Sequence, residues 1–171
     1  LAREQGFDPL TLKGSYAGAM GMPQFISSSY RHYAIDFDGD NIIDIWNNPN
    51  DAIGSVANYF AEHGWQKDKP IIAKVKVNGE KYKSVLGKGL KPNLSESELV
   101  KFGIKSNSLF EKNEKLKLFE YEGKNINEYW LAHNNFYVIT RYNHSHLYAM
   151  AVYQLSLEIE KLNNNISKTL D

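Results

Sequence analysis

The sequence predicts an α+β fold that is predominantly helical, with two helical parts on either side of a small α+β insertion. Apolar residues recur at helical spacing near both ends of the chain, and short alternating runs occupy its middle. The length of 171 residues suits one hydrophobic core better than two independent domains. We therefore distinguish residues 1–65, 66–128 and 129–171, and expect the last part to return to the helical core begun by the first.

Residues 1–65 are expected to form helices around a glycine-rich segment and an acidic loop. Pro23 suits the first turn of a helix that continues through Tyr33. A second helix is predicted from about Asp51 to His63, and Gly64 is expected to end it. Its apolar positions follow the pattern of one buried helix face: Ile53, Val56, Ala57 and Phe60.

Residues 66–128 carry most of the lysines and indicate the α+β insertion. A strand is predicted over residues 71–77, and the Asn78-Gly79 turn predicts that residues 81–85 pair back on it. Ser95 and Glu98 form a capping box before a short helix over residues 99–102. A second hairpin is predicted from two strand-like runs on either side of Gly123, residues 115–122 and 127–131.

Residues 129–171 return to aromatic and apolar side chains. Asn134 or Asn135 is expected to cap a helix that begins at Phe136, and a longer helix is expected from about Ser145.

The composition excludes several classes of function. The 20 Lys and Arg residues balance the 20 Asp and Glu residues, which argues against a nucleic-acid binder. The absence of cysteine excludes a disulfide framework, a thiolate zinc site and a cysteine nucleophile. No apolar run approaches the roughly 20 residues that span a bilayer. The chain opens at Leu1 in what resembles the tail of a helix, so we expect it to be part of a larger protein.

The most specific local pattern is the acidic loop, residues 36–44. Asp36, Asp38 and Asp40 occupy positions 1, 3 and 5 of a tight loop, and the carbonyl of Ile42 occupies position 7. Hard oxygen ligands at this spacing suit calcium, as in an EF-hand loop between two helices. The alternative is a solvated acidic turn, although three aspartates at this spacing repel one another without a cation. The sequence therefore predicts one structural Ca²⁺ site.

The acidic loop departs from the EF-hand pattern at two positions. Position 6 is Asn41 rather than Gly, which is tolerable because Asn adopts the left-handed conformation. Position 12 is Asn47 rather than the bidentate Glu, so the closing ligand must lie elsewhere. Asp51, at the start of the next helix, is the natural candidate, and Asp44 at position 9 would contribute directly or through water.

Two further segments have unusual compositions. Residues 13–25 are rich in glycine and other small residues, which permit close approach either of a packed helix or of a ligand. Residues 134–148 combine tyrosines with amides and a hydroxyl, the groups that stack on and hydrogen-bond to sugars. Tyr137 and Tyr148 are equally compatible with core aromatic residues whose hydroxyls reach the surface.

Together these segments resemble the membrane-bound lytic murein transglycosylase B family. The order and spacing agree from about residue 3 to residue 155, with a diverged middle part. The matching segments are residues 14–25, 28–30, 33–37, 51–60, 63–65, 135–137, 140–145 and 148–151.

The resemblance implies a lysozyme-like helical core and a periplasmic bacterial enzyme, with an outer-membrane anchor, if there is one, outside this chain. Such enzymes cleave the β-1,4 bond between N-acetylmuramic acid and N-acetylglucosamine in peptidoglycan glycan strands. The muramoyl 6-hydroxyl attacks instead of water and leaves a 1,6-anhydro end. One Glu acts first as acid and then as base, unlike the usual pair of carboxylates in glycosidases.

The resemblance also assigns residues to the site. The positions that match sugar-groove residues of the family are Ser15, Tyr16, Gln24, Tyr59, Tyr142, Asn143 and Tyr148. The metal ligands would be Asp36, Asp38, Asp40, the Ile42 carbonyl and Asp51. One extra residue between Trp46 and Asp51 leaves both Asn50 and Asp51 as candidates to close the metal site.

No carboxylate of this chain matches the catalytic Glu of the family, which is expected upstream of Leu1. Glu4 lies too close to the glycine-rich segment to be that residue. We therefore expect this chain alone to be inactive. The other hypotheses are a non-catalytic glycan-binding module and a calcium-binding interaction protein.

Overall fold

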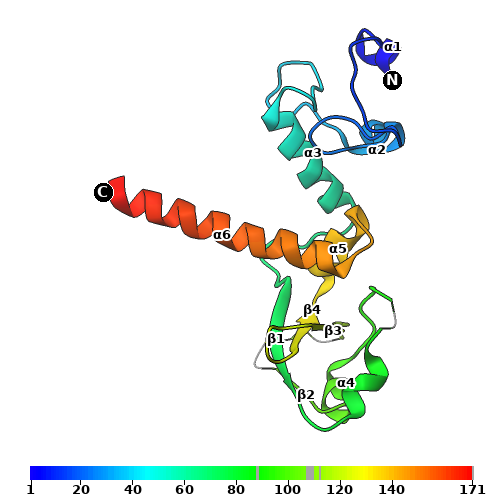
Figure 1. The fold of residues 1–171 in the computed structure, drawn as a ribbon. Helices are drawn as coiled ribbons and strands as arrows, with labels where there is room; N and C mark the ends of the chain where they lie inside the picture. Colours follow the sequence, from blue (N-terminus) through cyan, green and yellow to red (C-terminus); the bar gives the residue numbers. More distant parts are fainter. Residues whose placement is uncertain (88, 107–109, 112, 171) are drawn as a thin grey trace. The chain divides into compact units, whose positions relative to one another are not determined.

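The computed structural model describes residues 1–87, 89–106, 110–111 and 113–170 (Figure 1). The chain divides into two compact units, Leu1–Gly64 and Trp65–Asp171. Among the described residues, no helix is both long enough and apolar enough to cross a membrane. The return of residues 129–171 to the core of residues 1–65 stays a prediction.

Residues 1–64, all of which are described, form three helices and no strand: α1 (Ala2–Gln5), α2 (Ser27–Tyr33) and α3 (Pro49–Glu62). Asn48 caps α3, because its side chain accepts a hydrogen bond from the Asn50 N–H at 3.0 Å. Pro49 follows at the first helical position, where its missing N–H costs nothing. The fully buried apolar residues of this unit are Phe25, Tyr30, Ile45 and Ala52.

The prediction of a helix starting at Pro23 is wrong, since α2 begins at Ser27. Met20 and Phe25 exchange two backbone hydrogen bonds, of 2.8 and 3.0 Å, which close a tight turn over the residues between them. Gln24 has a φ of 54° within that turn, and a right-handed helix cannot pass through this conformation.

The helix predicted from Asp51 to His63 is confirmed as α3, although its buried face differs from the apolar pattern. Ile53 is 69% exposed, whereas the buried residues are Asp51, Ala52, Gly54 and Ser55. These small or polar side chains let the preceding loop lie directly on the helix. The Ser55 hydroxyl accepts the Ile35 N–H at 3.0 Å, and a Cβ on Gly54 would lie 2.5 Å from the ring of Phe37.

Within the described part of Trp65–Asp171, an antiparallel sheet has the strand order β2-β1-β4-β3. The strands are β1 (Ile72–Val77), β2 (Ile104–Lys105), β3 (Lys117–Tyr121) and β4 (Glu128–Ala132). The predicted strand over 71–77 and the predicted hairpin around Gly123 are therefore confirmed.

The prediction that residues 81–85 pair with the first strand is wrong. They form the 3₁₀ helix η1 (Lys81–Val85), and β2 takes the edge of β1 instead. Tyr82 and Val85 are both buried, and a spacing of three places them on one side of a 3₁₀ turn but on opposite faces of a strand.

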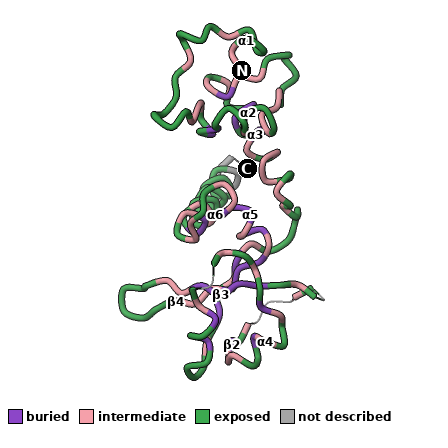
Figure 2. The backbone as a smooth tube through the Cα atoms, turned by 90° about the vertical axis from the view of Figure 1, so that its right-hand side faces the viewer, coloured by how far each residue is buried: buried purple, intermediate pink, exposed green. Residues whose placement is uncertain are grey.

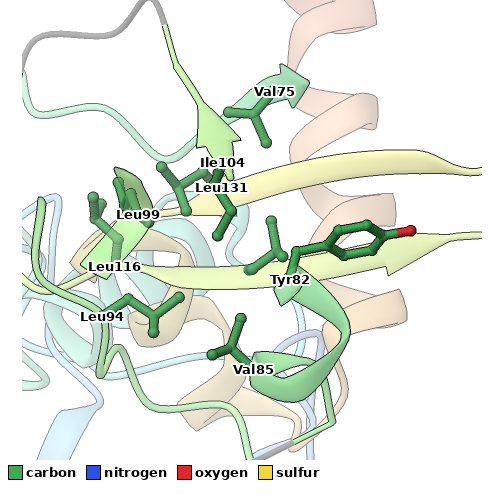
Figure 3. Packing of buried hydrophobic residues seen from close by; sticks show 9 residues of the cluster. Val75, Tyr82, Val85, Leu94, Leu99, Ile104, Leu116 and Leu131 are labelled. Carbon is green, nitrogen blue, oxygen red and sulfur yellow. The ribbon is translucent and has the colours of Figure 1, made fainter. Parts of the chain in front are cut away.

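The core of the sheet unit is a cluster of buried side chains from the sheet, η1 and α4 (Glu96–Lys101) (Figure 3). Its members are Val75, Tyr82, Val85, Leu94, Leu99, Ile104, Leu116, Leu118 and Leu131. The predicted capping box begins α4, where the Glu98 carboxylate accepts the Ser95 N–H at 2.8 Å.

Two helices follow the sheet, α5 (Asn134–Tyr142) and α6 (His146–Leu170). Helix α5 begins two residues earlier than predicted, with His133 rather than an asparagine at the N-cap position. Helix α6 begins close to Ser145, as predicted, and beyond its first two turns most of its described residues are exposed (Figure 2).

Candidate functional site

The acidic loop lies between α2 and α3 and winds around the carboxylate of Asp36. One oxygen of Asp36 accepts the N–H groups of Gly39 and Asp40 at 2.7 and 3.1 Å, and the other accepts the Asn41 N–H at 2.8 Å. Asn41 has a φ of 69°, so it adopts the left-handed conformation that the sequence required at position 6. Hydrogen bonds from backbone N–H groups to the Asp36 carboxylate therefore fix the shape of the loop.

Three predicted metal ligands come together in the structure. Carboxylate oxygens of Asp36, Asp38 and Asp51 all lie within 4.8 Å of one another. Asp51 projects from the first turn of α3 and is fully buried. Its two oxygens accept the N–H groups of Phe37 and Asp44, each at 2.8 Å, so this side chain joins both ends of the loop to the helix.

The other predicted ligands are less closely associated with this group. Asp40 is not one of the three clustered carboxylates, and its Oδ1 accepts the Ile42 N–H at 2.8 Å. Asn50 is exposed and donates its amide N–H to Asp38 at 3.3 Å. Of the two candidates to close the site, Asp51 is the one whose oxygen lies beside those of Asp36 and Asp38.

The surroundings keep two neighbouring carboxylates ionised. Hydrogen bonds from the amides of Asn48 and Asn50 lower the pKa of Asp38. Burial pushes the pKa of Asp44 upward, but hydrogen bonds from Asn47 and the Trp46 N–H outweigh it, and the pKa lies below its usual value. Three acidic groups confined within 4.8 Å, one of them fully buried, fit a hard divalent cation better than a solvated turn.

Tyr30 supports the acidic loop from the side of α2. Its hydroxyl donates to the carbonyl of Ile43 at 2.7 Å. Burial raises the pKa of Tyr30 to about 12, and the charges of Asp44 and Asp51 add to the effect. Sequence reasoning did not single out Tyr30 or Asn48. The Asn48-Pro49 pair was a usable signal, because it marks a capped helix start two residues before Asp51.

The glycine-rich segment forms two consecutive turns. Isolated antiparallel bridges join Gly14 to Met20 and Met20 to Phe25. Ser15 braces the first turn, since its hydroxyl accepts the Ala19 N–H at 3.1 Å. Tyr16 lies in that turn with a relative exposure of 110%, so its side chain extends fully into solvent. Gln24 lies in the second turn, is exposed, and donates to the Gly21 carbonyl at 2.9 Å.

Tyr59 is held by a cluster of rings on α3 and its neighbours. The His63 imidazole stacks on it with centroids 4.0 Å apart and planes at 19°. Tyr33 meets the same ring edge-on at 4.8 Å, and Phe25 lies 6.0 Å away. Phe25 follows Gln24 directly, so this cluster fixes the second turn of the glycine-rich segment against α3.

The remaining predicted groove residues lie where α5 passes into α6. Tyr142 ends α5, and Asn143 follows in an extended conformation with an exposed side chain. The Ser145 N–H donates to the Asn143 carbonyl at 2.7 Å, and the Ser145 hydroxyl accepts the Tyr148 N–H at 3.2 Å. Tyr142 and Tyr148 are half-buried. A short capped turn therefore fixes the backbone around Tyr142, Asn143 and Tyr148.

None of the glutamates, all of which lie in the described part of the chain, is buried. Where their pKa departs from its ordinary value it is lowered: by Arg31 for Glu4, by Ser95 for Glu98 and by Lys74 for Glu128. No glutamate thus occupies the desolvated environment that keeps a general acid protonated at neutral pH.

Comparisons with known proteins agree with these observations. The model of the family described as "Transglycosylase SLT domain" matches residues 1–157. Membrane-bound lytic murein transglycosylase B of Escherichia coli K12 is 46% identical over 155 residues, which cover 91% of this chain and 42% of that protein.

Three solved structures extend the comparison. Catenated lytic transglycosylase SltB1 of Pseudomonas aeruginosa has a TM-score of 0.89 at 50% identity, and the match covers 94% of this chain and 53% of that chain. Escherichia coli SLT35 in complex with calcium has a TM-score of 0.84 at 44% identity, with 94% and 50% covered. Pseudomonas aeruginosa SltB3 in complex with NAG-NAM-pentapeptide has a TM-score of 0.70 at 34% identity, with 88% and 41% covered.

The chain thus spans about half the length, or less, of the relatives that it matches. The lysozyme-like lytic transglycosylase fold, with its helices and small antiparallel sheet, is shared with them. The family model matches most of the chain, and a lytic murein transglycosylase is 46% identical over 91% of it. The chain therefore belongs to the transglycosylase SLT domain family.

Proposed function

We propose that residues 1–171 form the glycan-binding and calcium-binding part of a lytic transglycosylase that acts on peptidoglycan glycan strands. The observation that carries this proposal is the family match, combined with solvent-accessible polar and aromatic side chains at each predicted groove position. SltB3, a relative, binds NAG-NAM-pentapeptide, which has the chemistry of such a strand.

The reaction would cleave the β-1,4 bond between N-acetylmuramic acid and N-acetylglucosamine. A glutamic acid gives its proton to the leaving oxygen, and the resulting carboxylate takes the proton of the muramoyl 6-hydroxyl as that oxygen attacks the anomeric carbon. The product is a 1,6-anhydro ring, and no water is consumed. The residues of this chain would bind and orient the strand: Tyr16, Tyr59, Tyr142 and Tyr148 through ring faces, and Ser15, Gln24 and Asn143 through hydrogen bonds.

The proton-transferring Glu is contributed from outside residues 1–171. Two observations support this part of the proposal, namely that no glutamate is buried and that each resolved pKa shift among the glutamates is downward. The same observations favour a second function for this chain in isolation, non-catalytic binding of peptidoglycan. A peptidoglycan substrate implies a periplasmic location, with any outer-membrane anchor outside these residues.

One structural Ca²⁺ is proposed for the acidic loop. Asp36, Asp38 and Asp51 would supply carboxylate oxygens, with Asp40 and the Ile42 carbonyl completing the set. The ion would neutralise charges that otherwise repel, and would tie the loop to α3 through the buried Asp51. SLT35, another relative, was solved in complex with calcium.

Replacing Tyr16 by Ala tests the glycan-binding proposal with little risk to the fold. The ring is fully exposed, so the free energy of unfolding is expected to change by less than about 0.5 kcal/mol. Loss of a stacking ring is expected to weaken binding to glycan strands about tenfold, or about 1.4 kcal/mol. Co-sedimentation with purified peptidoglycan sacculi measures this effect.

The matched control is Leu10→Ala, which removes another side chain that is 92% exposed but is not predicted to touch the glycan. Retention on sacculi should be unchanged in this control. Equal retention of Tyr16→Ala and the wild-type chain would contradict the role given to Tyr16.

A further inference from the structure

Two adjoining hollows lie in the sheet unit, between residues 66–70, residues 110–111 and 113–115, and the start of α5. Their volumes are about 380 and 270 Å³. Both are lined by Gln66, Glu111, Glu114 and Asn134, so the two hollows adjoin, and together they are called here the polar hollow. None of these residues belongs to the predicted groove set or to the acidic loop.

Buried side chains make the walls of the polar hollow rigid. Asn135 is 1% exposed; its carbonyl oxygen accepts the Gln66 N–H at 2.8 Å, and its amide donates to the carbonyls of Gln66 and Lys69 at 2.7 and 3.0 Å. His133, also 1% exposed, lies with Nδ1 2.7 Å from the carboxylate of Glu114. The hydrogen bonds of Asn135 hold the backbone of residues 66–69 on one side of the polar hollow, and the contact of His133 with Glu114 holds the other side.

The charges that line the polar hollow are only partly compensated. Lys69 pairs with Glu111, and Glu114 is engaged by His133 and by the Glu111 N–H at 3.1 Å. Among the described residues, no carboxylate lies within 4.0 Å of Lys91 or Lys115. The positive charge of Lys115 contributes to lowering the pKa of Glu98. These two ammonium groups favour a ligand with a carboxylate.

The smaller part of the polar hollow offers a negative charge instead. Asp68 lines it and is exposed. A ligand with both a carboxylate and an amino group, such as a short peptide, would match the lysines at one end and this aspartate at the other. An uncharged sugar ring would use neither.

The polar hollow lies within peptide reach of the predicted groove residue Asn143. Asn134, Tyr137 and Arg141 are three and four residues apart and therefore share one face of α5. The Arg141 guanidinium lies over the Tyr137 ring at 5.9 Å. From Asn134 to Tyr142 the helix rises by about 12 Å, at ~1.5 Å per residue, and Asn143 follows directly. An extended pentapeptide spans at most about 17 Å.

We infer that the polar hollow binds the peptide that branches from the glycan strand, with Lys91 and Lys115 holding its carboxylates. This inference rests on the proposed function, because the peptide reaches the hollow only from a sugar bound near Asn143. It adds the peptide to the part of the substrate that this chain recognises.

The experiment compares two ligands on the full chain, the NAG-NAM disaccharide with a pentapeptide and the same disaccharide without it, its lactyl carboxyl group capped as the methylamide. Isothermal titration calorimetry of the wild-type chain is expected to give about tenfold tighter binding of the peptide-bearing ligand. The Lys91→Ala/Lys115→Ala variant should lose this difference and keep its affinity for the bare disaccharide, since two exposed ion pairs together account for about that factor.

The control variant is Lys76→Ala/Lys105→Ala, which removes the same charge from an exposed cross-strand pair outside the hollow. It should bind both ligands as the wild type does. Equal binding of both ligands by the wild type would overturn the peptide site and leave the proposed function intact. Binding of neither ligand would overturn the proposed function as well, and equal losses in both variants would attribute the effect to overall charge and overturn the site.

Discussion

The Asp51→Asn variant is expected to lose about 4–6 kcal/mol of stability in the presence of calcium. Its carboxylate is fully buried and accepts two backbone N–H groups. An amide offers one acceptor and turns its NH₂ toward the other N–H, and a buried donor left without a partner costs about 1–3 kcal/mol. An ion present at 100 times its dissociation constant contributes about 2.7 kcal/mol, and this contribution is lost with the ligand.

Urea denaturation with calcium and with a chelator separates the two contributions. The wild-type chain should lose stability on chelation, whereas Asp51→Asn should start lower and no longer respond. Asp8→Asn is the matched control, because Asp8 is exposed and caps only the nearby Leu10 N–H. A variant that gains as much stability from calcium as the wild type would show that Asp51 is not a ligand.

The Gly21→Ala variant is expected to lose about 2–5 kcal/mol of stability and to weaken glycan binding. Gly21 has a φ of 64°, where a side chain costs about 1–2 kcal/mol. A Cβ there would lie 2.5 Å from the Ile45 carbonyl oxygen, and overpacking of this kind adds about 1–3 kcal/mol. The Met22 N–H donates to that oxygen at 2.9 Å, so the turn that carries Gln24 would separate from Ile45, which directly follows the acidic loop.

Gly18→Ala distinguishes backbone strain from close packing. Gly18 has a φ of 77°, but a Cβ there would have no neighbour within 4 Å. Only the conformational cost of about 1–2 kcal/mol is expected. Urea denaturation and co-sedimentation with sacculi measure both variants. Equal losses in the two would mean that the approach of Gly21 to Ile45 has no energetic weight.

Local signals predicted the elements whose hydrogen bonds or caps are encoded nearby. The capping box at Ser95, the hairpin around Gly123 and the helix ending before Gly64 all appear in the structure. One failure occurred where distant residues decide. Residues 81–85 turn into a 3₁₀ helix because β2, more than twenty residues later in the chain, takes the edge of β1, and no local pattern contains that competition.

The candidate site was predictable where the motif itself fixes spacing. Aspartates at alternate positions indicated the acidic loop, and the structure brings Asp36, Asp38 and Asp51 together. The supporting residues were not predictable in the same way. Tyr30 supports the acidic loop through a hydrogen bond to the Ile43 carbonyl, thirteen residues away in the chain, and this contact arises only when α2 packs against the loop.

The most direct test of the whole account is incubation of this chain with purified peptidoglycan sacculi in the presence of calcium. The pellet is assayed for bound protein, and the supernatant is assayed by mass spectrometry for 1,6-anhydro muropeptides. We expect the chain to be retained on the sacculi and no anhydro product to be released. This expectation follows from the proposed function, in which residues 1–171 bind the strand without supplying the acid and base. Release of anhydro muropeptides would contradict it by locating the catalytic carboxylate within these residues, and absence of retention would contradict the glycan-binding role.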